Sequence, residues 1–435
     1  MKRPLLLRVV LALVAVPELV AAQPQPGREG VFLIRGGTVW TGTGVTLQSA
    51  DVLIRDGRIE AVGPNVTAAG ATVIDARGKF VYPGITDAYT PLGLTEIGGV
   101  ATMGLRSELG EFNPHMRPVV AINVDSELLG VTRANGVTTA LTVPSGGIIS
   151  GQAALINTAG WTWEDMAVQA SAAFVINYPR AGSGEGFGGG RRPGQAGAAG
   201  QASAQARERT ERQIRELERV LTNARAYEAQ RAAGSREVDL VYEALRPLVR
   251  REVPALIQAD SDEQIRTALA FSDSMGIRLV VYGGRDAWKV RDLLAQKNVP
   301  VVLGSIQSTP PDDAPYDAIY AQPGVLLEAG VKFAFSTGGG ANARHVPYHA
   351  ALAVAYGLPA DAAMKALTIW PAEIFGADKS IGTIEPGKMA NLFITSGDPL
   401  DVRSIVSDVF VRGRRVPMDD RHNRLYQKYR ARPPG

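Results

Sequence analysis

The 435-residue chain has no cysteine, only four histidines and few aromatic residues, which make up 6% of the sequence. Without cysteine the chain cannot form disulfides or offer thiolate ligands to a metal. Charged residues are also modest at 20%, and the formal net charge is only +3. This balance gives no electrostatic reason to expect a nucleic-acid partner. Hydrophobic residues make up 45% of the chain, which is ample for the core of one large domain or two ordinary ones.

The first 22 residues have the composition of a secretory signal peptide. Lys2 and Arg3 precede an apolar stretch over 9–16, and small residues follow before Gln23. A membrane anchor is the alternative, but Pro17 and Glu18 interrupt a run that is already too short to span a bilayer. Removing residues 1–22 would leave the chain close to neutral. We therefore predict a periplasmic or secreted protein with no membrane attachment after cleavage.

Short strand patterns flank a longer central region. Residues 32–40, 51–63 and 71–78 read as strands joined by glycine-containing turns, and residues 382–394 and 406–413 show the same pattern near the other end. Between them, apolar strand-like segments alternate with helical stretches, which is typical of parallel βαβ units. These central segments cover residues 85–91, 136–144, 152–156, 172–179, 253–260, 278–283, 299–304 and 331–336. Eight such units favour a closed barrel, and a doubly wound open sheet is the alternative.

One insertion, residues 181–232, interrupts this order. Its first part, 181–206, is rich in Gly, Ala and Gln and lacks the apolar content of a core, so we expect a surface loop. The sequence does not indicate a function for this loop. In its second part, Ile214, Leu217 and Leu221 recur at helical spacing within a charged run. We expect an amphipathic helix packed on the barrel with a solvated outer face. A partner-binding helix is the alternative.

The stretch Lys79–Gly93 contains Pro83-Gly84, then Asp87, Tyr89 and Pro91 at alternate positions. It resembles the first barrel strand of the amidohydrolase superfamily, whose pattern is Pro-Gly-x-x-Asp-x-His-x-His. Residues 368–376 and 381–394 are similar to that superfamily's last helices and closing segment, and within it the chain is most similar to exported relatives of imidazolonepropionase.

The resemblance implies an α/β fold in two parts. A (β/α)8 TIM barrel would occupy residues 83–381, and a composite β-sandwich domain would combine residues 30–82 with 382–420. The two chain ends would then meet in one domain beside the barrel.

The same resemblance implies one or two divalent metal ions, commonly zinc, at the barrel mouth. Carried over position by position, the ligand sites of the superfamily fall on Tyr89, Pro91, Gln258, Gly283 and Gly338. Proline and glycine side chains cannot coordinate a metal, and a neutral amide is a weak ligand for zinc. We therefore predict a degenerate metal site that holds no metal, and we expect no other cofactor.

Other polar residues fall on segments expected to form the barrel mouth, where catalytic residues of barrels gather. The candidates for catalysis are His345 and Glu96. The candidates for substrate binding are Tyr89, Gln258, Glu111, His115 and Arg344. The alternative is structural: the carboxylates cap helices and bind neighbouring loops, and His345 supports its own loop.

Two functions follow from these expectations. The first, implied by the resemblance, is a hydrolase of non-peptide carbon–nitrogen bonds in amides or cyclic amides. The second is a catalytically silent barrel that binds a small molecule or a partner, as a homo-oligomer or with a paralogous subunit.

Overall fold

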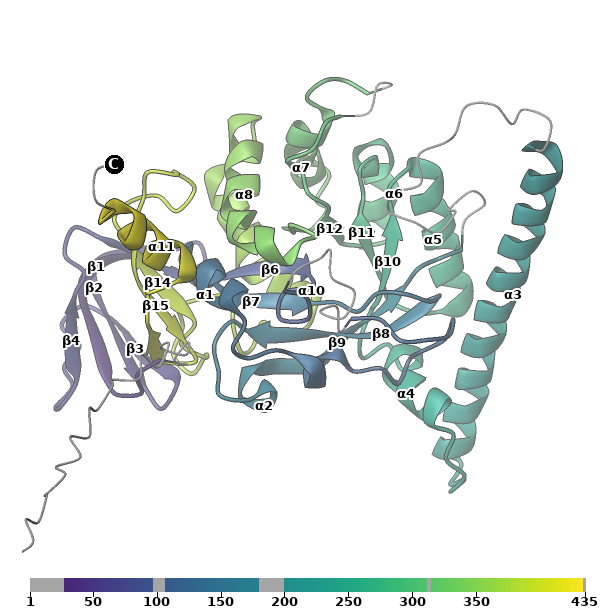
Figure 1. Cartoon of the computed structure of the whole chain (residues 1–435), viewed down its shortest axis with the longest axis horizontal. Helices are drawn as coiled ribbons and strands as arrows, with labels where there is room; N and C mark the ends of the chain where they lie inside the picture. The colour runs from purple at the N-terminus through teal and green to yellow at the C-terminus, as the bar shows by residue number, and fades with distance from the viewer. Residues whose placement is uncertain (1–26, 97–105, 180–198, 311–313, 433–435) are drawn as a thin grey trace, which may run out of the picture.

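The computed structural model describes residues 27–96, 106–179, 199–310 and 314–432, and it contains two eight-stranded sheets (Figure 1). The predicted signal segment and residues 181–198 of the glycine-rich stretch lie outside the described residues. Within the part that the structure describes, no helix is long and apolar enough to cross a membrane.

The first sheet joins the two ends of the chain. Its strands are β1 (Phe32–Trp40), β2 (Thr46–Arg55), β3 (Arg58–Gly63), β4 (Thr72–Asp75), β5 (Phe80–Pro83), β14 (Leu392–Thr395), β15 (Val406–Val411) and β16 (Arg414–Val416). Strand β14 pairs antiparallel with β5, so the C-terminal strands extend the N-terminal sheet. Apolar side chains from both ends, among them Ile34, Val52, Leu392 and Phe410, bury one shared core. This confirms the composite β-domain, which lies at the left of Figure 1.

The second sheet is the barrel. Its strands are β6 (Ile85–Thr90), β7 (Val137–Thr142), β8 (Ile149–Asn157), β9 (Ala167–Ile176), β10 (Ala255–Ala259), β11 (Leu279–Gly283), β12 (Val301–Leu303) and β13 (Phe333–Phe335). They lie side by side in chain order. The backbone N–H of Gly338, just after β13, donates to the carbonyl of Tyr89 on β6 at 3.1 Å, which brings the first and last strands together. The predicted eight-stranded barrel is confirmed as a nearly closed sheet.

Strand β8 departs from the expected parallel pattern. It pairs antiparallel with both β7 and β9, whereas β6 with β7 and every pair from β9 to β13 are parallel. Only residues 143–148 connect β7 to β8, and Gly146 and Gly147 turn there with φ of 87° and 63°. A parallel neighbouring strand requires a crossover connection of roughly a dozen residues or more. A link this short therefore allows only a hairpin. The prediction of βαβ units throughout was wrong at this strand.

Helices cover the outside of the barrel. They are η2 (Pro118–Ala121), α1 (Glu127–Arg133), α2 (Trp163–Met166), α5 (Asp262–Met275), η3 (Ala287–Val290), α6 (Arg291–Gln296), α7 (Ala318–Glu328), η4 (Gly340–His345), α8 (Val346–Ala355), α9 (Ala360–Leu367) and α10 (Ile369–Ile374). A further helix, α11 (Arg421–Arg430), buries none of its residues and lies beside α1. The helix boundaries follow local chemistry, as α5 illustrates. Ser261 and Gln264 form a capping box at its start, and Gly276 ends it in the left-handed conformation at φ 55°.

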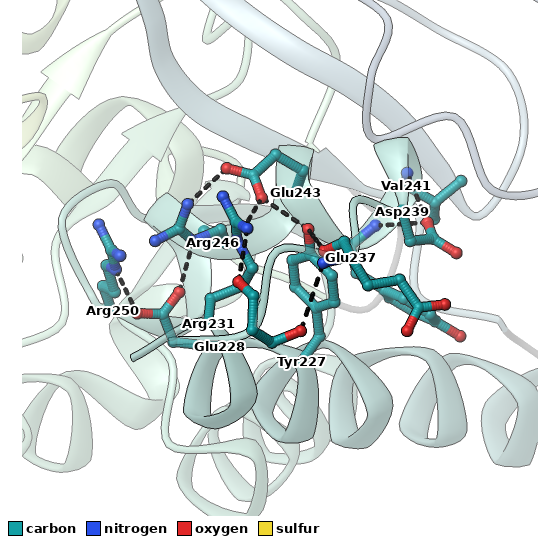
Figure 2. A network of polar contacts seen from close by, with 11 residues as sticks. Tyr227, Glu228, Arg231, Glu237, Asp239, Val241, Glu243, Arg246 and Arg250 are labelled. Carbon is teal, nitrogen blue, oxygen red and sulfur yellow. Dashed lines mark hydrogen bonds and ion pairs between the residues drawn. The ribbon is translucent and has the colours of Figure 1, made fainter. Parts of the chain in front are cut away.

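The insertion forms a long helix hairpin, α3 (Ala199–Ala232) and α4 (Leu240–Val249), at the right of Figure 1. Leu217 and Leu221 on α3 are fully buried in the main core, which confirms the predicted helix packed on the barrel. Polar contacts join the two helices (Figure 2). The Arg246 guanidinium lies 2.6 Å from Glu228 and also pairs with Glu243, whose carboxylate accepts from the Tyr227 hydroxyl at 2.7 Å.

Asn391 connects the composite domain to the barrel. Its side-chain N–H groups donate to Asn157 Oδ1 at 2.8 Å and to Thr139 Oγ1 at 3.2 Å, while its Oδ1 accepts from the backbone of Arg412 at 2.7 Å. A carboxylate at this position could accept but not donate, so the amide suits this contact. Asn391 is buried, and this junction fixes the composite domain against β7 and β8.

Candidate functional site

The C-terminal ends of the barrel strands form the mouth, the place where barrel enzymes assemble their sites. Tyr89 of β6 and Tyr282 of β11 dominate it. Their rings stack with centroids 3.5 Å apart and planes 8° apart. In the sheet, β12 and β13 lie between these two strands, so the pair reaches across the barrel rather than along one face. The ring of Tyr89, the residue that the resemblance equates with the superfamily's first histidine, therefore occupies this part of the mouth.

Both phenols are held in their neutral form. Burial raises the pKa of Tyr89 to about 12, an effect that the nearby Arg106 opposes. Burial also raises the pKa of Tyr282, and the charges of Asp87 and Asp260 add to this rise. At neutral pH each hydroxyl can donate and accept a hydrogen bond. The mouth thus offers two phenol O–H groups.

Asp87 lies beneath this pair and closes the barrel. Its carboxylate is fully buried and accepts hydrogen bonds from the Thr337 N–H at 3.1 Å, the Thr337 hydroxyl at 2.5 Å and the Tyr89 N–H at 3.3 Å. Burial raises its pKa to about 7, although these three donors favour the ionised form. Because its oxygens are already engaged, Asp87 holds β6 to the end of β13 rather than facing a ligand.

Asp260, just after β10, is a mouth residue that the sequence candidates missed. A side chain built on Gly283 would place its Cβ 2.3 Å from Asp260 Oδ1, so the carboxylate fills the space beside Gly283, the position that the resemblance equates with a ligating histidine. Gln258 Nε2 lies 3.3 Å from Asp260 Oδ2. The acid at the end of Ile257-Gln258-Ala259-Asp260 was visible in the sequence, but nothing there showed that it turns toward β11.

These residues do not fit a divalent metal of the superfamily's type. Gly338 contributes no side chain, and a Cβ built there would lie 3.3 Å from the Tyr282 hydroxyl. Pro91 has no donor atom, and Asp87 is engaged as described. Over residues 27–96, 106–179, 199–310 and 314–432, no group of three or more His, Asp or Glu is arranged to hold a metal ion. The remaining groups are one carboxylate, Asp260, with two phenols and one amide, and these are a poor donor set for zinc.

Three other predicted residues lie on loops and contact different partners. Glu96 accepts from Asn123 Nδ2 at 3.1 Å, and Glu111 accepts from Gln213 of α3 at 3.0 Å. His115 is exposed. The contacts of these side chains hold separate loops, and no contact joins one of them to another.

Arg344 and His345 face a different part of the surface. They end η4 and line a groove of about 430 Å³ between the barrel and the C-terminal segments. Arg344 Nε donates to His345 Nε2 at 2.9 Å, and Arg344 Nη1 lies 2.6 Å from His422 Nδ1. Burial lowers the pKa of His345, and the positive charge of Arg344 lowers it further. The lining of this groove includes neither Tyr89 nor Tyr282.

The fold has clear relatives among solved structures. The crystal structure of an amidohydrolase from Thermotoga maritima superimposes with a TM-score of 0.75 at 27% identity, covering 89% of this chain and 99% of that one. Molinate hydrolase shares the fold at a TM-score of 0.56 and 18% identity, covering 90% of this chain and 95% of that one. The likeness includes the composite domain as well as the barrel.

Sequence comparison points the same way over a shorter span. The model of the amidohydrolase family matches residues 318–416, from α7 through β16. The D-hydantoinase of Geobacillus stearothermophilus is 44% identical over 70 residues, 16% of this chain and 14% of that protein. The allantoinase of Solibacter usitatus is 45% identical over 73 residues, 16% of this chain and 15% of that protein. These alignments span about a seventh of each relative. The family-model match and the amidohydrolase structures together support membership of the amidohydrolase superfamily.

Proposed function

We propose that this protein hydrolyses non-peptide carbon–nitrogen bonds of small cyclic amides. The main support is a fold shared with an amidohydrolase over 89% of this chain. In addition, its mouth presents groups that can bind an amide, namely the Tyr89 and Tyr282 hydroxyls, Gln258 and Asp260. The similarity to a hydantoinase, a dihydroorotase and an allantoinase supports the cyclic-amide class.

We further propose that the metal site is degenerate and that no other cofactor takes part. In this scheme Asp260 accepts a proton from water as the water attacks the amide carbonyl carbon. A tyrosine hydroxyl donates to the oxyanion that forms, and the C–N bond then breaks as the leaving nitrogen takes up the proton. His345 and Glu96 remain the candidates that the sequence suggested. Their contacts with Arg344 and Asn123 make them weaker choices than Asp260.

The stacked rings favour a second function. Tyr89 and Tyr282 stack across the mouth, the part of the fold where barrel enzymes bind their substrates. A barrel sealed in this way would bind a ligand or a partner without hydrolysis, as a homo-oligomer or with a paralogous subunit. The signal-like N-terminus supports a periplasmic or secreted setting for either function.

One experiment separates the two functions. The purified protein is assayed with hydantoin, dihydroorotate and allantoin, with and without added Zn, Mn or Ni, and its bound metal is measured by elemental analysis. The first proposal expects turnover without stoichiometric metal and a loss of roughly a hundredfold or more in Asp260→Asn, a typical size for general-base catalysis. Asp292→Asn is the matched control, because Asp292 is 90% exposed on α6.

Each outcome has a definite meaning. Saturable binding without turnover supports the silent barrel. Turnover that requires a stoichiometric metal overturns the degenerate site. Turnover that survives Asp260→Asn but is lost in His345→Ala or Glu96→Gln returns catalysis to the residues suggested by the sequence.

A further inference from the structure

The groove beside Arg344 and His345 is built from segments far apart in the chain. Its walls come from α1, from η4 and the start of α8, from the loop between β14 and β15, and from the residues around the start of α11. Figure 1 shows α11 beside α1 at the edge of the composite domain. The groove holds about 430 Å³, enough for a small organic molecule. We call it the Arg344 groove.

One wall is cationic and lacks a counter-charge. The guanidinium of Arg344 contacts the rings of His345 and His422 through two of its three nitrogens. In the part of the chain that the structure describes, no carboxylate lies within 4.0 Å of Arg344 in an ion pair. An arginine whose neighbours are imidazoles keeps N–H donors for a planar oxyanion, which it binds better than any neutral group.

The single acid that lines the groove does not fill this role. Asp420 caps α11, where its Oδ1 accepts from the backbone N–H groups of His422 at 2.7 Å and Asn423 at 3.1 Å. Its Oδ2 accepts from the Asn423 side chain at 2.8 Å. The charge of Asp420 also acts on buried Arg133, whose pKa it raises against the stronger lowering by burial. The carboxylate oxygens of Asp420 are therefore already hydrogen-bonded, and its negative charge acts on Arg133.

Other residues of the lining are apolar and open to solvent. Val402 is 71% exposed and Ile405 is 70% exposed, and both line the groove together with Val406 and Met418. Isolated exposed aliphatic side chains are ordinary, but two of them that line the same groove as an arginine without a carboxylate partner form a surface of mixed character. Such a surface complements a molecule that carries an anionic head and an apolar body.

We propose that the Arg344 groove binds a small organic oxyanion with an apolar chain, such as an alkyl carboxylate, with the oxyanion on Arg344 and the chain on Val402 and Ile405. This site is separate from the barrel mouth and does not depend on the proposed hydrolase function. It accounts for the clustering of His345 and His422 around Arg344 without assigning catalysis to them.

The test compares four probes by calorimetry: octanoate, acetate, octanol and octylammonium. We expect saturable binding of octanoate, with acetate, octanol and octylammonium each weaker by roughly tenfold or more, since each lacks the chain or the negative charge. Arg344→Gln should weaken octanoate binding by roughly tenfold or more. Ile405→Ser should weaken octanoate but not acetate. Arg266→Gln, at an exposed arginine on α5, is the matched control and should change nothing.

Histidine NMR keeps the test decisive if the Arg344 variant fails to fold. The chain has only four histidines, so their ring signals can be assigned by substitution. In the wild-type protein, octanoate should shift the signals of His345 and His422 and leave exposed His115 in place. Equal effects of Arg344→Gln and Arg266→Gln, equal binding of octanoate and octanol, or unmoved His345 and His422 signals would each overturn the proposal.

Discussion

Replacing Asp87 with asparagine should change how the stability of the barrel depends on pH. The native carboxylate is fully buried, and burial raises its pKa from 3.8 to about 7. In the unfolded chain the same group ionises near its ordinary pKa. Between these two values the folded state binds more protons than the unfolded state, so stability is lost as pH rises through the folded pKa. The full cost is about 4 kcal/mol once the carboxylate is ionised in both states.

Asparagine preserves the shape and the hydrogen bonds while removing this titration. Its Oδ1 can still accept from the N–H groups of Thr337 and Tyr89. Its Nδ2 can donate to the Thr337 hydroxyl, which in turn has the Gly339 carbonyl at 3.2 Å as an acceptor. We therefore expect Asp87→Asn to gain stability relative to wild type as pH rises, by up to about 4 kcal/mol between pH 4 and pH 8.

The assay is chemical denaturation followed by tryptophan fluorescence at several pH values, with wild type and variant measured side by side. Taking the difference cancels the other carboxylates, such as Asp75, whose pKa is lowered by Arg77 and which therefore gives the opposite trend. Thr337→Val should move the midpoint of the wild-type titration upward, because the lost hydroxyl donor favours the ionised form. Thr337→Ser keeps the donor and serves as its control.

A difference between Asp87→Asn and wild type that stays constant from pH 4 to pH 8 would refute the reasoning. It would mean that the three donors outweigh burial and keep Asp87 ionised throughout. A wild-type protein that gains stability relative to the variant as pH rises would refute it as well.

Three further predictions concern packing. Tyr282→Ala should unstack Tyr89 and lower stability by about 0.5–1.5 kcal/mol beyond the loss of buried area, measured by thermal denaturation. Arg246→Gln should speed hydrogen exchange in α3 more than in the barrel strands, because Arg246 joins α4 to α3. Gly136→Ala should destabilise by roughly 1–3 kcal/mol in denaturation experiments, since φ is 78° and the new Cβ would lie 2.9 Å from the Phe393 ring.

Each of these predictions has its own control. Tyr282→Phe keeps the stack and should retain most of the stability, so an equal loss in both variants would contradict the role of the rings. For the helix hairpin, Arg212→Gln on the exposed face of α3 should leave hydrogen exchange unchanged. Equal protection of α3 in the two variants would contradict the role of Arg246 in joining α4 to α3. Gly44→Ala is the control for Gly136, because its φ of 91° is similar but no atom lies within 4 Å of its Cβ. Equal losses in these two would assign the effect to backbone strain alone.

Much of the architecture was predictable from local pattern. The apolar periodicity located the strands of both sheets, and the resemblance to the amidohydrolase superfamily implied that the two chain ends share a β-domain. The spacing of Leu217 and Leu221 identified the buried face of α3. These features depend on side chains a few positions apart, whose directions are set by the regular geometry of a strand or helix. The direction of β8 was the exception, because it is decided by the length of the turn rather than by the strand itself.

The site depended on contacts between strands and segments distant in the chain. Tyr89 was a candidate, but its partner Tyr282 was not, since periodicity shows the face on which a ring lies and not what stands opposite it. The same applies to Asp260, whose carboxylate fills the space beside Gly283.

The sequence by itself determined the scaffold of this protein, and it places Tyr89, Pro91 and Gly338 at the positions that the resemblance assigns to metal ligands. The tertiary structure alone decided what occupies the mouth, and it alone brought Arg344 and His345 to His422 in a separate groove. The physical reason is that secondary structure arises from nearby residues, whereas a site forms where the folded chain brings remote side chains within a few ångströms of one another.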